Sequence, residues 1–231
     1  METVKIWNDQ SYLDNNLEAQ RFYPNEEFIR FFSRYIKNKT KNKRILELGH
    51  GIGSNIIPVI QEGFINVCGI DISEASVDLT NSRLNKLNLK CNLKTGNCLD
   101  PKFGFSYTFD FIIDVFSMYS MNNQDFLELI KNINNSLSDD GIFYSFFPSK
   151  NSNAFTNHIP SILLDDSTLN GIYRDTSPFY GNFYNFRFMY PFEYKNILES
   201  NGFKVIELNT ITRNYNMKET FEWISIVAQK I

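Results

Sequence analysis

The sequence predicts a doubly wound α/β fold on a mostly parallel sheet of seven strands. Three apolar runs of strand length, residues 44–48, 66–70 and 109–115, each lead into a segment whose apolar residues recur at helical spacing. A glycine-rich turn, residues 49–53, follows the first run directly. The length of 231 residues suits one large α/β domain and is too short for two. We therefore expect residues 1–231 to form a single domain.

The remaining elements follow from caps and periodicity. Asn55 and Ser73 are typical residues to begin the first two crossover helices, and residues 126–137 predict a third amphipathic helix. Short apolar runs predict strands at residues 93–95 and 141–147. A closing helix over 191–200 ends before Gly202, and strands over 203–208 and 223–228 follow, joined by a polar loop.

Two segments lie outside this alternation. Residues 11–36 are predicted to be mainly helical and to form an N-terminal cap within residues 1–42, ahead of the half that holds the glycine turn, residues 43–147. Residues 148–190 lose all periodicity, mix polar stretches with aromatics, and are far longer than an ordinary α/β connection. We expect them to be an insertion over the sheet, followed by the closing helix and strands, residues 191–231.

The composition narrows the class of partner. Twenty-three basic and 26 acidic residues give a net charge of −3, which is unlike a protein that binds nucleic acid. No window approaches the roughly 20 apolar residues that span a bilayer, so no membrane association is expected. Cys68, Cys91 and Cys98 have no metal-binding spacing and fit reduced thiols, which indicates a cytoplasmic protein without a bound metal. The sequence does not distinguish a monomer from a homodimer.

The glycine turn and an acidic residue together indicate a nucleotide-type ligand. Glycines at alternate positions, Gly49, Gly51 and Gly53, let the backbone turn sharply and let a ligand touch it. About 20 residues later Asp71 ends the second strand, where a carboxylate can accept hydrogen bonds from both hydroxyls of a ribose. A tight turn followed by a helix-capping Asp is the structural alternative.

From about residue 43 to residue 230 the chain resembles the class I S-adenosylmethionine (SAM)-dependent methyltransferases of the small-molecule type. Glu47 precedes a GxGxG turn as in that family, whereas Ser54 occupies the third glycine position of the dinucleotide fingerprint. Further matches are Gly96-Asn97-Cys98, where the family has Gly-Asp-Ala, the fourth strand at 109–113, and the turn at 137–141. The resemblance implies SAM as the cofactor.

The resemblance also implies roles for individual residues. Glu47 and the glycine backbone would hold the methionine end of SAM, Asp71 the ribose, and residues 97–98 the adenine edge, while residues 114–116 would flank the methyl group. For Asn97, a contact with adenine and an ordinary structural role at the end of a strand are equally expected. His50 is expected only to shape the pocket. The implied cofactor-binding set is Tyr23, Glu47, Gly49, His50, Gly51, Gly53, Asp71, Ile72, Asn97, Cys98, Asp114, Val115 and Phe116.

The acceptor is expected to be a small polar metabolite, such as a sugar or nucleotide-sugar intermediate. Methyl transfer needs alignment, and a base only for a hydroxyl or protonated amine acceptor; His158 is the candidate base, and a structural His is the alternative. The insertion, residues 148–190, is expected to be a lid over the acceptor, and its candidate acceptor contacts are Arg174, Tyr180, Tyr184 and Arg187. A hydrophobic lid whose arginines face water is the alternative for this stretch.

Two other functions compete with this interpretation. A nicotinamide-dependent oxidoreductase would use the same turn and the same acidic residue, although Ser54 and the closing strands argue against it. A non-catalytic SAM-binding scaffold subunit is the second, because no indispensable base is visible. The intact glycine turn and its two acidic residues, Glu47 and Asp71, favour the enzyme.

Overall fold

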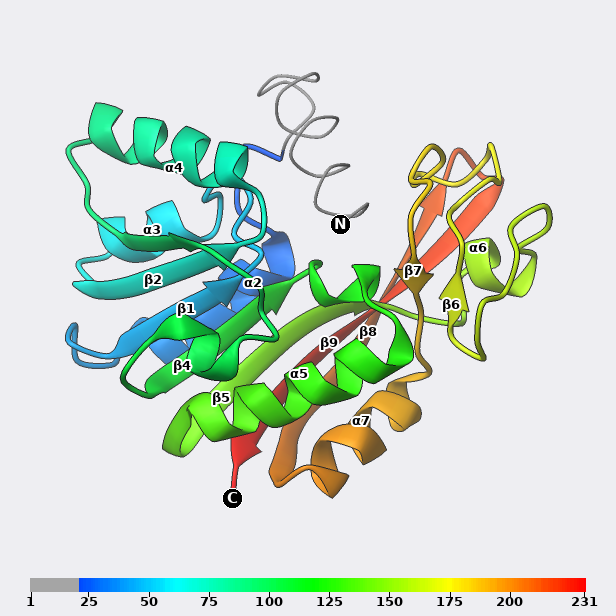
Figure 1. Ribbon diagram of the computed structural model, residues 1–231. Helices are drawn as coiled ribbons and strands as arrows, with labels where there is room; N and C mark the ends of the chain where they lie inside the picture. Colours follow the sequence, from blue (N-terminus) through cyan, green and yellow to red (C-terminus); the bar gives the residue numbers. More distant parts are fainter. Residues whose placement is uncertain (1–20) are drawn as a thin grey trace.

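A seven-stranded sheet forms the centre of the computed structural model, which describes residues 21–231 (Figure 1). The strand order is β3-β2-β1-β4-β5-β9-β8; the first five strands are parallel, and β9 runs antiparallel to both neighbours. The predicted sheet is confirmed. The strands are β1 (Arg44–Leu48), β2 (Asn66–Asp71), β3 (Asn92–Thr95), β4 (Phe109–Val115), β5 (Leu137–Pro148), β8 (Phe203–Tyr215) and β9 (Glu219–Lys230).

The helices begin at capping residues. Ser73 Oγ accepts a hydrogen bond from the amide of Ser76, and Asn122 Oδ1 accepts one from Asp125, so both polar caps satisfy first-turn amides. The first part of the predicted N-terminal helical segment, residues 11–20, lies outside the described residues. The helices are α2 (Glu26–Phe31), continued by the π-helical turn η3 (Phe32–Ile36), α3 (Ile56–Gln61), α4 (Glu74–Lys86), α5 (Asn123–Ser136) and α7 (Pro191–Ser200), with short turns η4 (Pro101–Gly104) and η5 (Met118–Ser120).

Strand β5 shows how the helices cover the two faces of the sheet. Its Phe147 ring lies 5.6 Å from Phe126 of α5 and 5.3 Å from Tyr194 of α7. Tyr144, three residues earlier and therefore on the opposite face, stacks on Phe31 of α2 at 4.3 Å. Helices α5 and α7 thus pack on one face and α2 on the other, with α5 and α7 nearer the viewer in Figure 1.

The closing strands are longer than the sequence predicts. The expected polar loop between residues 208 and 223 is paired backbone. Strands β8 and β9 form one hairpin from Phe203 opposite Lys230 to Tyr215 opposite Glu219, with a register shift between Val205 and Glu207. The turn falls at Asn216 and Met217, both at positive φ. The polar side chains of this stretch resemble a loop in sequence, but the cross-strand ladder satisfies their backbone groups.

The insertion, residues 148–190, packs against the end of this hairpin. It contains only the short elements α6 (Asn153–Thr156), β6 (Thr168–Leu169) and β7 (Phe186–Arg187). Phe179 lies 4.7 Å from Phe221 and 5.2 Å from Trp223 of β9, measured between ring centroids. Figure 1 shows the insertion and the hairpin tip side by side at one end of the sheet.

No helix among residues 21–231 combines the length and the apolar character that crossing a bilayer requires.

Candidate active site

Three acidic residues gather where the parallel strands end. Glu47 is the penultimate residue of β1, Asp71 is the last residue of β2, and Asp114 lies one residue before the end of β4. Pairing of β1 with both neighbours places Leu48 beside Ile70 and beside Asp114. The carboxyl ends of adjacent parallel strands are where ligands bind in doubly wound sheets.

The glycine turn is fixed by close packing. Gly49 has φ +61°, and its amide donates to the carbonyl of Ile70 at 2.8 Å. A Cβ on Gly49 would lie 2.4 Å from the Cβ of Ser117, and one on Gly53 would lie 2.6 Å from Cγ2 of Thr80. Only glycine lets the turn fit between helix α4 and the segment after β4.

Asp71 joins this turn to the turn after β2. Its Oδ2 accepts the Gly51 amide at 2.9 Å and its Oδ1 accepts the Ser73 amide at 3.0 Å. Asp71 is buried, with 5% of its surface exposed. Each carboxylate oxygen keeps a further lone pair, so the group can still accept two hydroxyl donors. The arrangement therefore fits the ribose of SAM.

Glu47 has one oxygen without a partner. Asn55, predicted as a helix cap, instead donates from Nδ2 to Glu47 Oε1 at 2.6 Å, whereas Glu47 Oε2 is buried with no hydrogen bond among the described residues. Burial raises the pKa of Glu47 to about 8, against the lowering effect of the Asn55 bond and of the positive Arg21. A ligand ammonium group would satisfy this oxygen, and the methionine end of SAM carries one.

Asp114 is satisfied within the protein. Its Oδ1 accepts the amides of Ser117 and Met118, both at 3.0 Å, and its Oδ2 accepts the hydroxyl of Ser145 at 2.7 Å. Burial raises its pKa, and none of its surface is exposed. Asp114 thus holds the turn after β4, in which Val115 is also buried and Phe116 adopts φ +63°.

The other predicted cofactor residues surround the same turns. Asn97 is exposed and accepts the Leu99 amide at 3.0 Å, and Ile72 and Cys98 are half-buried. Burial, reinforced by the charge of Asp71, raises the pKa of Cys98 to about 12, so its thiol stays protonated. His50 is buried, its Nδ1 lies 2.9 Å from the Gly51 carbonyl, and burial lowers its pKa.

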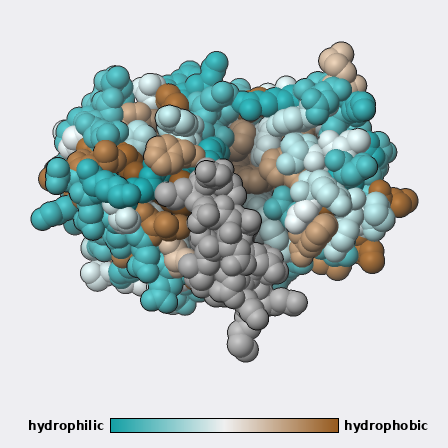
Figure 2. All heavy atoms as spheres, turned by 90° about the horizontal axis from the view of Figure 1, so that it is seen from above, coloured by the Kyte–Doolittle hydropathy of each residue, from teal (hydrophilic) through white to brown (hydrophobic). Residues whose placement is uncertain are grey.

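An aromatic pocket of about 360 Å³ opens beside Phe116. Its floor is formed by four rings, and the Trp223 ring lies 4.8 Å from Phe116, 4.9 Å from Phe146 and 5.2 Å from Phe179. Charged side chains of α2 and β8 stand at its rim. Figure 2, which views the molecule from above, shows apolar atoms in a hollow between its two halves. The lining residues are Arg21, Tyr23, Pro24, Asn25, Glu26, Glu27, Phe116, Phe146, Phe179, Ile211, Arg213 and Trp223.

Of the residues predicted from the sequence, Tyr23 and Phe116 line this pocket. The predicted acceptor residues of the insertion do not. Arg174 Nε lies 2.7 Å from Oε2 of the fully buried Glu219, and Arg187, with 2% of its surface exposed, donates to Asn123 Oδ1 at 2.6 Å. Both guanidinium groups therefore have partners inside the protein.

The remaining predicted residues are placed elsewhere too. The Tyr184 hydroxyl lies 2.7 Å from that of Tyr119, and Tyr180 is 57% exposed. His158 lies in the loop after α6, with Nδ1 3.0 Å from the Ser161 carbonyl. Sequence reasoning did not select Phe146, Trp223 or Arg213, because only the β5-β9-β8 order brings them beside Phe116.

Comparison with known proteins identifies the family. A family model described as a methyltransferase domain matches residues 17–208. The chain belongs to this family. Its domain is a SAM-dependent methyltransferase domain, which sets aside the nicotinamide-dependent oxidoreductase. The non-catalytic SAM-binding scaffold is not tested by these matches.

Solved structures and sequence relatives agree with this family. A SAM-dependent methyltransferase from Methanosarcina mazei has a TM-score of 0.68 at 18% identity, covering 84% of this chain and 94% of that chain. Magnesium protoporphyrin IX methyltransferase from Synechocystis with bound S-adenosylhomocysteine (SAH) has a TM-score of 0.69 at 14% identity, covering 100% and 98%. The EEF1A lysine methyltransferase 2 of Danio rerio is 34% identical over 104 residues, 44% of this chain and 44% of that protein.

A second relative, an uncharacterized protein of Rickettsia prowazekii, is 33% identical over 113 residues, 46% of this chain and 19% of that protein. The matches to these two curated relatives thus span less than half of each relative's length.

The glycine turn yields a prediction with an internal control. We expect Gly49→Ala to destabilise the protein by about 2–4 kcal/mol, because a strained φ adds to the clash with Ser117. Gly181→Ala also has a positive φ but meets no atom within 4 Å, so it should cost only the conformational strain, about 1–2 kcal/mol. Urea unfolding measures both, and equal losses would contradict the packing argument.

Proposed function

We propose that this methyltransferase transfers the methyl group of SAM to a small metabolite bound in the aromatic pocket. The observation that carries the proposal is the position of Phe116. It belongs to the pocket floor, and it lies in the turn that Asp114 holds and that packs, through Ser117, against the glycine turn. The proposed acceptor pocket therefore shares the turn after β4 with the predicted cofactor site.

The lining of the pocket indicates the kind of metabolite. Four aromatic rings offer flat apolar surfaces, on which a sugar ring or an aromatic ring stacks well. At the rim Arg213 forms an ion pair with Glu26, and Glu27 and Arg21 also line the pocket. A small acceptor with one flat apolar face and polar edges fits this combination, which agrees with the sugar or nucleotide-sugar acceptor predicted from the sequence.

The cofactor would be held by the residues that the sequence predicts. Glu47 Oε2, which has no protein partner among the described residues, would accept from the ammonium group of SAM. Asp71 would accept from the ribose hydroxyls, and Asn97 and Cys98 would lie at the adenine edge. The glycine backbone would follow the methionine chain, because no side chain projects from it.

SAM supplies a methyl group on a positively charged sulfur, and the protein mainly aligns the acceptor and excludes water. The aromatic floor would exclude water, since Trp223 and Phe146 are almost fully buried. The hypothesis that His158 acts as a base is testable. Because its ring lies outside the aromatic pocket, we expect transfer to proceed without it.

Testing the acceptor pocket requires the acceptor, which a screen of metabolite fractions with isotopically labelled SAM can name by mass spectrometry. With it, Phe179→Ala should raise the acceptor KM about 3- to 10-fold through lost stacking and leave the SAH dissociation constant unchanged. Tyr180→Ala is the matched control, because that ring is 57% exposed and outside the pocket. Equal KM values in both aromatic variants would contradict the pocket assignment.

His158→Ala should change kcat by far less than the roughly 10²-fold loss expected of a base.

Glu47 should make cofactor binding release a proton. With its pKa near 8 the free enzyme is largely protonated at pH 7, whereas the carboxylate that pairs with an ammonium group has lost that proton. We therefore expect SAH affinity to rise with pH between about 6 and 7.5, by up to about tenfold per unit.

Calorimetry in buffers of different ionisation enthalpy measures the released proton directly. Glu47→Gln has no proton to lose, so its SAH affinity should be nearly flat over the same range, apart from titration of the ligand's own amine. A wild-type affinity that is as flat as that of the variant would show that Glu47 does not hold the ammonium group.

A further inference from the structure

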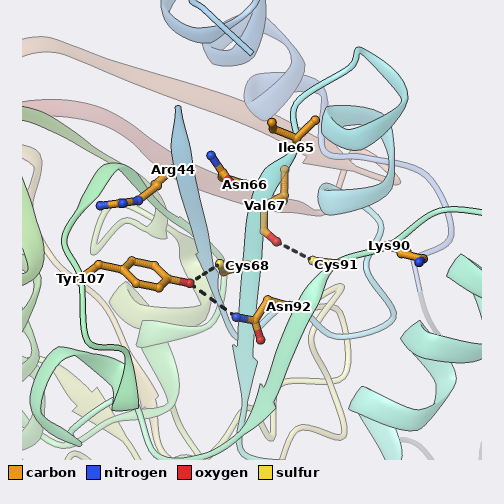
Figure 3. A pocket seen from close by; sticks show the side chains of 9 residues that line it. All are labelled: Arg44, Ile65, Asn66, Val67, Cys68, Lys90, Cys91, Asn92 and Tyr107. Atoms are coloured by element: carbon orange, nitrogen blue, oxygen red, sulfur yellow. Dashed lines mark hydrogen bonds between the residues drawn. The ribbon is translucent and has the colours of Figure 1, made fainter. Parts of the chain in front are cut away.

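A second pocket, of about 570 Å³, lies where strands β1, β2 and β3 begin (Figure 3). Arg44, Asn66 and Asn92 are the first residues of these strands, and all three line it. The proposed cofactor site is at the carboxyl ends of the same strands. This amino-edge pocket is therefore at the opposite edge of the sheet and has no part in the proposed methyl transfer.

The amino-edge pocket is positively charged. Arg44 and Lys90 line it, and no carboxylate does. Asp110, which neighbours Arg44 across strands β1 and β4, accepts from Lys43 Nζ at 2.7 Å and from the Arg44 amide at 2.8 Å, so its charge is already compensated. Two exposed cations thus line one cavity in a chain whose net charge is −3, and in Figure 3 their side chains point toward opposite ends of it.

Both cations lack an oxygen partner among residues 21–231. The Arg44 guanidinium lies over the Tyr107 ring, 4.8 Å from its centroid, and neither it nor the Lys90 ammonium has a hydrogen bond or ion pair there. Six other arginines of the described chain differ in this respect. Those whose guanidinium group contacts a protein oxygen are Arg30, Arg34, Arg83, Arg174, Arg187 and Arg213.

Neutral groups complete the lining. Asn92 Nδ2 donates to the Tyr107 hydroxyl at 3.4 Å, and the Cys91 thiol donates to the Val67 carbonyl at 3.1 Å (Figure 3). Burial raises the pKa of both pocket thiols, Cys68 and Cys91, so neither is a thiolate near neutral pH. No metal-binding group of three or more His, Cys, Asp or Glu side chains is found in residues 21–231. The lining therefore suits an anion better than a cation or an electrophile.

The size of the pocket indicates what carries the anion. Arg44 begins β1 and Lys90 precedes β3, with β2 between them, so their backbones are about 10 Å apart. Both side chains are exposed and point apart in Figure 3, but each is long enough to turn toward a phosphate group placed between them. The pocket is larger than a phosphate alone requires, and Ile65 and Val67 give it an apolar wall.

We propose that the amino-edge pocket binds a phosphorylated small molecule, with the phosphate between Arg44 and Lys90 and the organic body against β2. Charge-assisted hydrogen bonds from guanidinium and ammonium groups are the interactions that phosphate prefers in proteins.

The test titrates the full chain, saturated with SAH so that the cofactor site is occupied, by calorimetry at constant ionic strength. Glucose 6-phosphate is the probe, glucose is its uncharged control, and inorganic phosphate separates the phosphate group from the organic body. We expect glucose 6-phosphate to bind more tightly than inorganic phosphate and glucose not to bind. Arg44→Gln and Lys90→Gln should each weaken glucose 6-phosphate binding about tenfold.

Lys131→Gln is the matched control, because Lys131 is an exposed lysine of α5 outside the pocket. Unchanged SAH affinity shows that each variant is folded, and Lys90, which is exposed, can be replaced without touching the core. Absence of saturable binding, or equal weakening by Lys131→Gln, would overturn the site. Equal affinities for inorganic phosphate and glucose 6-phosphate would overturn the proposal that the pocket binds the organic body of the ligand.

Discussion

The carboxylate of Asp71 joins the turn after β1 to the turn after β2, and the candidate site depends on this connection. By accepting the amides of Gly51 and Ser73 it fixes the glycine turn after β1 against the start of helix α4. Those two amides would otherwise be poorly satisfied at the buried end of the sheet. The same carboxylate keeps lone pairs for a ligand. One group therefore holds the two turns together and can also bind the ligand.

The other two acidic residues differ in whether the protein satisfies their buried oxygens. Asp114 and Glu47 are both buried, and burial raises the pKa of both. Asp114 has hydrogen bonds to both oxygens and shapes the turn that presents Phe116. Glu47 keeps one oxygen without a partner in the described chain, which is costly unless a ligand compensates it. A buried group left unsatisfied is thus the stronger sign of a binding site.

The sequence was informative where the determinants are local. The glycine turn, Asp71 and the first strands could be predicted because each depends on a few neighbouring residues. The hairpin β8–β9 was predicted too short, since its outer half is polar and is fixed only by cross-strand pairing. Arg174 and Arg187 were chosen as acceptor contacts from composition, but their partners Glu219 and Asn123 are distant in sequence. The aromatic pocket likewise draws the four rings of its floor from four separate segments.

The most direct test of this account is a crystal structure of the protein with SAH. The account predicts the SAH ammonium within hydrogen-bond distance of Glu47 Oε2, the ribose hydroxyls on Asp71, and the sulfur facing the aromatic pocket beside Phe116. An SAH molecule whose ribose is held by another residue, or whose sulfur faces away from Phe116 while Glu47 Oε2 stays unpaired, would contradict it.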